Sequence, residues 1–253
     1  MILVRYSDFV LKGSKMGGKD SIFHDGIVLY NNRDYNGALT FFLSLPDDAD
    51  LDNIELAYYI GLCYARLGRY DDALLYLEQV VTAGGSDDIK KDAPGSARVL
   101  QCRYILSIIY VMSDRRKLAM FELNKLLDAG FKPSSVYASM AYINWLDRDI
   151  DSSIANYKKA IELDSDNATA LNGLGYVLSS ENRDLSTALS YCKKALSIEP
   201  NSAACMDSLG FVYMKLGLMN DAFKYLRQAQ QLMPDNAEIS EHIQIAEDVM
   251  SSI

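Results

Sequence analysis

Apolar residues recur along most of the chain at intervals of three and four, which is the spacing of one face of an α-helix. Residues 201–236 show this pattern most clearly, with two apolar stripes separated by a short polar stretch. The order of small and large residues predicts two antiparallel helices joined by a tight turn. In chain order they are Leu209, Gly210, Tyr213, Ala222, Leu226, Ala229 and Pro234.

The same arrangement recurs, because small residues equivalent to Ala222 stand at positions 38, 73, 119, 153, 188 and 222, separated by 35, 46, 34, 35 and 34 residues. The longest spacing includes a Gly- and Asp-containing loop insertion at 82–96. We therefore predict an N-terminal segment and flexible linker at 1–20, a helical array at 21–236 and a capping helix at 237–253. The predicted repeats lie near 21–52, 53–81, 97–130, 134–167, 168–200 and 203–236.

This unit resembles the tetratricopeptide repeat (TPR), whose pattern is W-x₂-L-G-x₂-Y…A-x₃-F…P over 34 residues. In the clearest copy Met206 replaces the Trp and Leu226 replaces the Phe. The resemblance implies an all-α fold, a right-handed superhelical solenoid of about six helix-turn-helix repeats with a helix covering its last apolar face. In the second repeat Gly68 is expected in a left-handed helix-terminating position. Asp71 is expected to cap the start of the following helix and to place a negative charge there.

The resemblance also implies a concave wall made by the first helix of each repeat. Partner contacts are expected three residues before and one residue after the small Gly or Ala, with a further bulky residue four after it. The predicted partner-binding residues are Phe23, Ile27, Tyr58, Leu62, Tyr104, Ile108, Tyr142, Trp145, Asn172, Tyr176 and Phe211. Asp207 occupies the same register at the more polar end. Tyr and Trp suit recognition because they bury large areas with few rotatable bonds. The alternative is that these side chains pack against the neighbouring first helix.

We expect a non-enzymatic scaffold or adaptor protein that binds an extended peptide or a partner helix in an aromatic concave groove. The alternative is a self-assembling structural oligomer that uses the apolar wall or residues 1–11 as its interface. Leu171–Tyr176 and Asp207–Tyr213 also resemble the last two repeats of some bacterial TPR proteins, several of them associated with the cell envelope. This likeness suggests a bacterial source.

Composition narrows the partner class. The chain carries 34 acidic and 25 basic residues, a formal net charge of -9, and no long basic run, so nucleic acid is not an expected partner. The only histidines, His24 and His242, lie at opposite ends, and no phosphate-binding loop or zinc-protease motif occurs. We therefore expect no catalytic residues, no metal and no cofactor.

Compartment is predicted from cysteine usage and hydropathy. The four cysteines fall inside helical patterns, which is typical of buried reduced thiols. No run approaches the roughly 18 apolar residues of a transmembrane helix. The expectation is a cytoplasmic protein without a transmembrane span, or a periplasmic or envelope-associated one if a leader has been removed.

Light scattering tests the self-assembly alternative. If residues 1–11 form an oligomer interface, deletion of residues 1–15 will convert an oligomer into a monomer. A strict monomer in both forms would contradict self-assembly.

Overall fold

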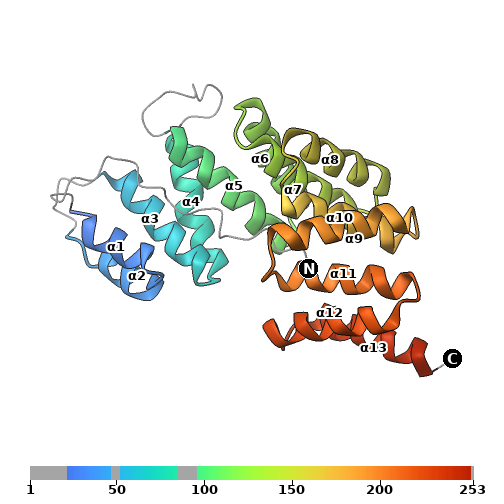
Figure 1. The fold of residues 1–253 in the computed structure, drawn as a ribbon. Helices are drawn as coiled ribbons and strands as arrows, with labels where there is room; N and C mark the ends of the chain where they lie inside the picture. The colour runs from blue at the N-terminus through green and yellow to red at the C-terminus, as the bar shows by residue number, and fades with distance from the viewer. Residues whose placement is uncertain (1–21, 47–51, 85–95, 252–253) are drawn as a thin grey trace. The chain divides into compact units, whose positions relative to one another are not determined.

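The computed structural model describes residues 22–46, 52–84 and 96–251, and within them it is all-α, as predicted (Figure 1). The predicted segment 1–20 and most of the predicted loop at 82–96 lie outside the described residues. The helices are α1 (His24–Asn31), α2 (Tyr35–Leu43), α3 (Asn53–Arg66), α4 (Tyr70–Ala83), α5 (Ser96–Met112), α6 (Arg116–Asp128), α7 (Pro133–Leu146), α8 (Ile150–Leu163), α9 (Ala168–Ser180), α10 (Leu185–Ile198), α11 (Ala203–Lys215), α12 (Met219–Leu232) and α13 (Ala237–Ser251).

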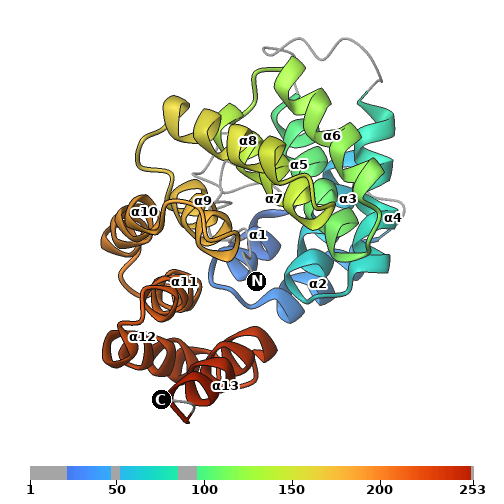
Figure 2. The same ribbon diagram turned by 90° about the vertical axis from the view of Figure 1, so that its right-hand side faces the viewer.

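The helices divide into two compact units, one containing α1 to α6 and the other α7 to α13. Within each unit, odd-numbered and even-numbered helices pair in the order that the repeat pattern predicts, and each pair packs on the next. In the second unit α7, α9, α11 and α13 also contact one another in sequence, so they form a continuous wall (Figures 1 and 2). We call this face of the second unit the α7–α13 wall.

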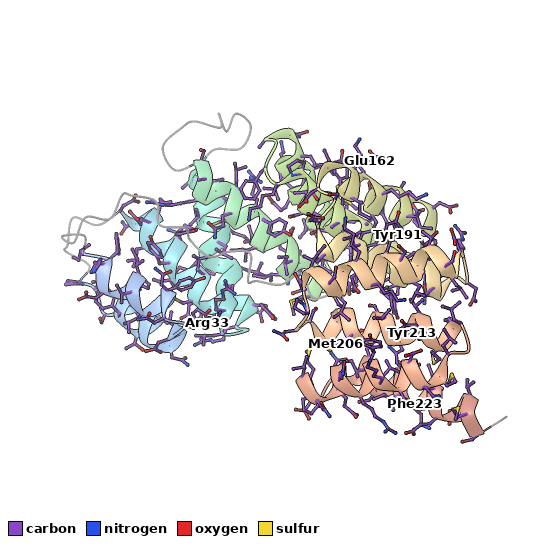
Figure 3. The ribbon with its side chains drawn as sticks, in the orientation of Figure 1. Arg33, Glu162, Tyr191, Met206, Tyr213 and Phe223 are labelled. Carbon is purple, nitrogen blue, oxygen red and sulfur yellow. The ribbon has the colours of Figure 1, made fainter. Side chains whose placement is uncertain are left out.

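The turns within the repeats use left-handed residues. Gly68 has φ +73° and Gly217 has φ +75°, so the prediction for Gly68 is confirmed. At the equivalent turn between α1 and α2 the left-handed residue is Arg33, at φ 65° (Figure 3). A residue with a Cβ adopts this conformation at some cost, which the packed helices on both sides must offset.

The prediction for Asp71 is wrong for the cap and confirmed for the negative charge at the helix start. Helix α4 begins at Tyr70 and its N-cap residue is Arg69, which makes no side-chain cap. Asp71 and Asp72 instead lie in the first turn, where their charge complements the helix dipole. Arg69 also forms an ion pair with Asp72 at 2.8 Å on the exposed surface.

The N-cap residue of α9 also connects this helix to the preceding helix pair, α7 and α8. Asn167 caps α9 by accepting the Ala170 N–H at 2.9 Å, and its side-chain amide donates to Ser134 Oγ at 2.8 Å. Ser134, on α7, in turn donates to the Ala160 carbonyl of α8. These three bonds fix the start of α9 against the preceding repeat, and therefore help to position the α7–α13 wall.

The degenerate third repeat holds its helices together with a buried ion pair. Arg103, at the position of the consensus Trp, contacts Glu122 of α6 at 2.6 Å, and both side chains are at most 10% exposed. Because the repeat pattern has a Trp at this position, Arg103 departs from it, and the contact with Glu122 compensates its charge.

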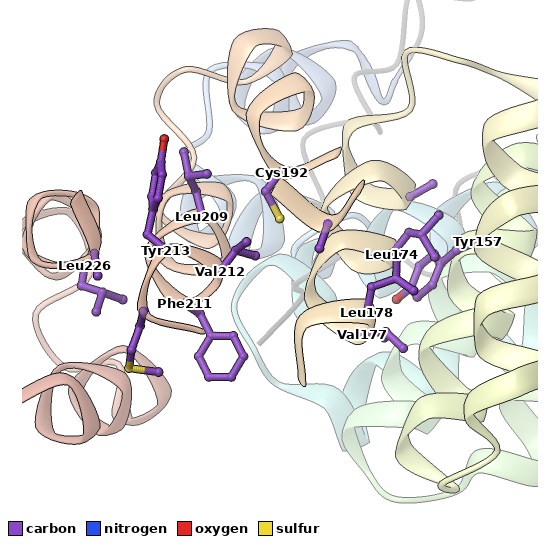
Figure 4. Close-up of a cluster of buried hydrophobic side chains, with 14 of the residues drawn as sticks. Tyr157, Leu174, Val177, Leu178, Cys192, Leu209, Phe211, Val212, Tyr213 and Leu226 are labelled. Carbon is purple, nitrogen blue, oxygen red and sulfur yellow. The ribbon is translucent and has the colours of Figure 1, made fainter. Parts of the chain in front are cut away.

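The core of the second unit lies between its helix pairs, where Leu174, Val177, Leu209, Val212 and Leu226 are buried (Figure 4). Glycines allow the two helices of a repeat to approach closely. A Cβ on Gly175 would lie 2.4 Å from Cys192 Sγ and 3.0 Å from the Ala188 carbonyl oxygen. A Cβ on Gly210 would lie 2.7 Å from Leu226 Cγ. Both contacts are too short for a methyl group.

Helix α13 covers the last repeat, with Ile239 and Ala246 buried against it. Met250 follows Ala246 at helical spacing but is 48% exposed, and Ile245 and Val249 are also exposed. The covering therefore comes from the first three turns of the helix.

The close approach at Gly175 predicts a specific coupling. Gly175→Ala should destabilise the protein by about 1–3 kcal/mol through overpacking, offset in part by the better helix propensity of Ala. Cys192→Ala removes the sulfur that the new methyl group would meet. The double variant should therefore be more stable than the sum of the two single effects predicts, as measured by urea unfolding. Strict additivity would contradict this packing.

Candidate functional site

The α7–α13 wall contains a cavity of about 200 Å³. Among the described residues its lining comes from all four wall helices. The lining residues are Tyr142, Trp145, Asn172, Tyr176, Ala204, Asp207, Ser208 and Glu238. We call this the wall cavity.

Four of the predicted partner-binding residues meet in the wall cavity: Tyr142, Trp145, Asn172 and Tyr176. A fifth, Phe211, is 7% exposed and lies behind the lining, with its ring 5.3 Å from that of Tyr176. The repeat register therefore identified residues of neighbouring helices that are close in space.

Aromatic rings form one side of the cavity. The Tyr142 and Trp145 rings are stacked, with centroids 5.9 Å apart and planes 24° from parallel. The Trp145 and Tyr176 rings meet edge to face at 5.7 Å. Side chains held in such mutual contacts have few accessible rotamers, so a ligand would meet a preorganised surface.

Carboxylates contribute a second side. Asp207 Oδ1 lies 2.9 Å from His242 Nδ1, and both side chains are about 5% exposed. The His242 ring lies 4.6 Å from the Phe211 ring, so helix α13 is joined to α11 by a polar and an aromatic contact. Glu238, also on α13, accepts a long hydrogen bond of 3.3 Å from the Tyr176 hydroxyl.

The electrostatic character of the cavity affects Tyr176. Burial, and to a smaller extent the nearby carboxylates of Asp207 and Glu241, together raise the pKa of its hydroxyl to about 12. A negative environment opposes loss of the phenol proton, because ionisation would add another negative charge. Tyr176 therefore remains a neutral hydrogen-bond donor throughout the physiological pH range.

Two lining residues carry buried polar atoms without a hydrogen-bond partner in the described structure: Trp145 Nε1, a donor, and Asn172 Oδ1, an acceptor. Asn172 is 2% exposed. A buried polar group without a partner costs free energy, and binding sites often contain such groups because a ligand can supply the missing partner.

Sequence reasoning placed Asp207 in the wall register without counting it among the partner-binding residues, and it missed Ala204, Ser208 and Glu238. Asp207 lies three residues before Gly210, in the same register as Asn172 before Gly175, so the repeat pattern did contain a signal for it. Ala204 and Ser208 lie on the same helix but outside that register. Glu238 comes from the capping helix, which has no equivalent in the repeats.

The other six predicted residues lie in the first unit, and five of them are buried: Phe23, Tyr58, Leu62, Tyr104 and Ile108. Ile27 is partly buried. The Tyr58 hydroxyl donates to Gln101 Oε1 of α5 at 2.7 Å, and burial raises its pKa. This contact matches the alternative in which such a side chain packs against the next first helix. Partner binding by these six residues stays a prediction.

Metal-binding side chains do not gather in the described part of the chain. No cluster of three or more His, Cys, Asp or Glu side chains with metal-binding potential occurs there. All four cysteines are buried, and burial raises the pKa of Cys63 to about 12, which disfavours the reactive thiolate. None of the described helices combines the length and hydrophobicity needed to cross a membrane.

Comparison with known families gives three matches. Sequence models described as tetratricopeptide repeat match residues 26–88 and 202–231, and a model described as TPR repeat matches residues 149–180. A comparison with curated protein sequences finds no significant match.

Solved structures show the same fold. A chain of the APC/C hetero-tetramer Cut9–Hcn1 is 14% identical, with a TM-score of 0.68, and the match covers 89% of this chain and 42% of that one. This chain thus spans less than half the length of that relative. The protein MamA is 21% identical, with a TM-score of 0.50, and the match covers 74% of this chain and 95% of MamA.

The raised pKa of Tyr176 predicts a pH dependence of stability. Below pH 10, the ordinary value for tyrosine, the hydroxyl is protonated in both the folded and the unfolded state, and its contribution to stability is complete. As the pH rises from 10 towards 12, the unfolded state loses its proton first, so the folded state loses stability. Tyr176→Phe should make this loss less steep in urea unfolding measured at several pH values. Identical slopes above pH 10 for both proteins would show that the pKa of Tyr176 is not raised in the folded state.

Proposed function

The chain is a tetratricopeptide-repeat protein, and we propose that it binds another protein by holding an extended peptide or a partner helix on the α7–α13 wall. Repeats of this family generally mediate protein–protein interactions, and such proteins are typically non-enzymatic. The proposal specifies which surface of this chain makes the contact.

The wall cavity is the observation that carries this proposal. It combines three rings with two unpaired buried polar atoms, on four helices that pack side by side. Aromatic anchors surrounded by a few oriented polar groups are the common composition of energetic centres in protein interfaces. Trp145 is central among these anchors because its ring contacts both Tyr142 and Tyr176.

The structural comparison supports the same class of function. The similar chain from the Cut9–Hcn1 structure belongs to a hetero-tetramer, so it assembles with a different protein. At 14% identity this likeness supports a shared fold, so the choice of contact residues rests on the geometry of this chain.

Selection from a displayed library of random peptides, followed by affinity measurement with purified full-length protein, tests the proposal. Trp145→Ala should weaken binding of the selected peptides by about 30-fold, because truncation of a central aromatic anchor costs about 2 kcal/mol. We choose Trp145 because it is only partly buried. Tyr104 is 3% exposed, and its removal would leave a cavity in the core of the first unit.

Phe121→Ala is the matched control, since Phe121 is an aromatic residue of α6 that is 53% exposed and outside the wall. It should leave peptide affinity unchanged. Trp145→Phe keeps a ring but removes the unpaired N–H, so it separates the contribution of the ring from that of the donor. Equal affinity of wild-type and Trp145→Ala protein for every selected peptide would overturn the proposed location of the site.

A further inference from the structure

We propose that the wall cavity binds the guanidinium group of an arginine side chain in the partner. This inference rests on the proposed function, since it names the chemical group that the partner would insert at the α7–α13 wall. Four properties of the lining support it: its charge, its rings, its unpaired acceptor and its size.

The charge of the lining favours a cation. Asp207 and Glu238 both line the cavity, and the lining residues that the structure describes include no Lys or Arg. His242, which contacts Asp207, adds a positive charge only when it is protonated. Lys215 lies over the Phe211 ring, 5.3 Å from its centroid, and does not belong to the lining. A negative, partly enclosed site attracts a cation and repels a carboxylate or phosphate.

The aromatic rings are suited to the same ligand. Tyr142, Trp145 and Tyr176 present π-systems whose faces are electrically negative, and Trp is the most effective partner for a cation among the aromatic side chains. A planar guanidinium can stack on such a ring and still donate hydrogen bonds at its edges, whereas an ammonium group cannot stack.

The lining offers three groups that accept hydrogen bonds, whereas its unpaired donor, Trp145 Nε1, is not one that a guanidinium can pair with. Asn172 Oδ1 is buried and has no partner within the described structure, and the carboxylates of Asp207 and Glu238 can each accept hydrogen bonds. Guanidinium presents five N–H donors in a fixed plane and no acceptor, so it can satisfy several of these oxygens together. Neutral apolar side chains would leave Asn172 Oδ1 unsatisfied.

The size of the cavity suits one side chain. Its volume of about 200 Å³ is below the range of ~300–1,000 Å³ that is usual for small-molecule sites. It nevertheless exceeds the space that one or two waters require. A single long side chain projecting from a peptide on the wall fits this volume better than a free cofactor does.

Trp145 provides a direct measurement, because it is the only tryptophan in the chain and lines the cavity. The probe is Nα-acetyl-arginine amide, titrated into the full-length protein while tryptophan fluorescence is recorded. Two further probes are the corresponding amides of citrulline, which is nearly isosteric and neutral, and of lysine. We expect a saturable change with the arginine probe, no saturation with citrulline, and weaker binding of lysine.

Isosteric variants test the role of charge. Glu238→Gln should weaken binding of the arginine probe about tenfold, which corresponds to loss of one charge-assisted hydrogen bond. Glu247→Gln makes the same charge change at an exposed position of the same helix, outside the lining, and should leave the affinity unchanged. Added salt should weaken binding to the wild-type protein more than binding to Glu238→Gln.

Equal binding of arginine and citrulline probes, or equal affinity in the Glu238→Gln and Glu247→Gln variants, would overturn the inference. Lysine binding as tight as arginine would overturn the preference for guanidinium. Failure of the inference is distinguishable from failure of the proposed function. If selected peptides bind in a manner that depends on Trp145 but lose no affinity when their arginines become citrulline, the wall binds peptides without an arginine site. If the arginine probe binds and no peptide does, the cavity is an arginine site and the proposed peptide binding fails.

Discussion

The structure depends on the close approach of two helices within each repeat. At every crossing the second helix presents a small residue that is fully buried: Ala38, Ala73, Ala119, Ser153, Ala188 and Ala222, all 0% exposed. A larger side chain at such a position would push the helices apart and shift the first helix relative to its neighbours, since packed interiors have little space to absorb it. The geometry of the α7–α13 wall therefore depends on residues that do not belong to it.

This constraint explains why the fold was predictable. Small residues at crossings, apolar stripes and glycines at turns are all local requirements, so they remain visible in the sequence even where the third repeat replaces Gly with Ser107 and Trp with Arg103. Asp71 was assigned a capping role because acidic residues favour helix starts. Helix α4 begins one residue before it, so Asp71 supplies negative charge in the first turn while Arg69 holds the N-cap position.

The candidate site was predictable only in part, for a physical reason. Register places Tyr142, Trp145, Asn172 and Tyr176 on the same side of successive helices, but it cannot distinguish a side chain that packs from one that binds. Tyr58 has the same register as Asn172, yet its hydroxyl is already paired with Gln101. The unpaired oxygen of Asn172 and the contribution of Glu238 depend on three-dimensional contacts across helices, and no local pattern encodes them.

Helix α13 has two roles, because it covers the apolar end of the last repeat and also supplies Glu238 to the cavity. It is the terminal helix of the described chain and packs on the array from one side, where fraying costs the least free energy. Occupancy of the cavity and attachment of this helix are consequently linked equilibria: a ligand that contacts Glu238 lowers the equilibrium constant for opening of α13, and opening of α13 lowers the affinity for that ligand by the same factor. A shortened chain ending at α12 would lose its cover and part of the cavity lining together.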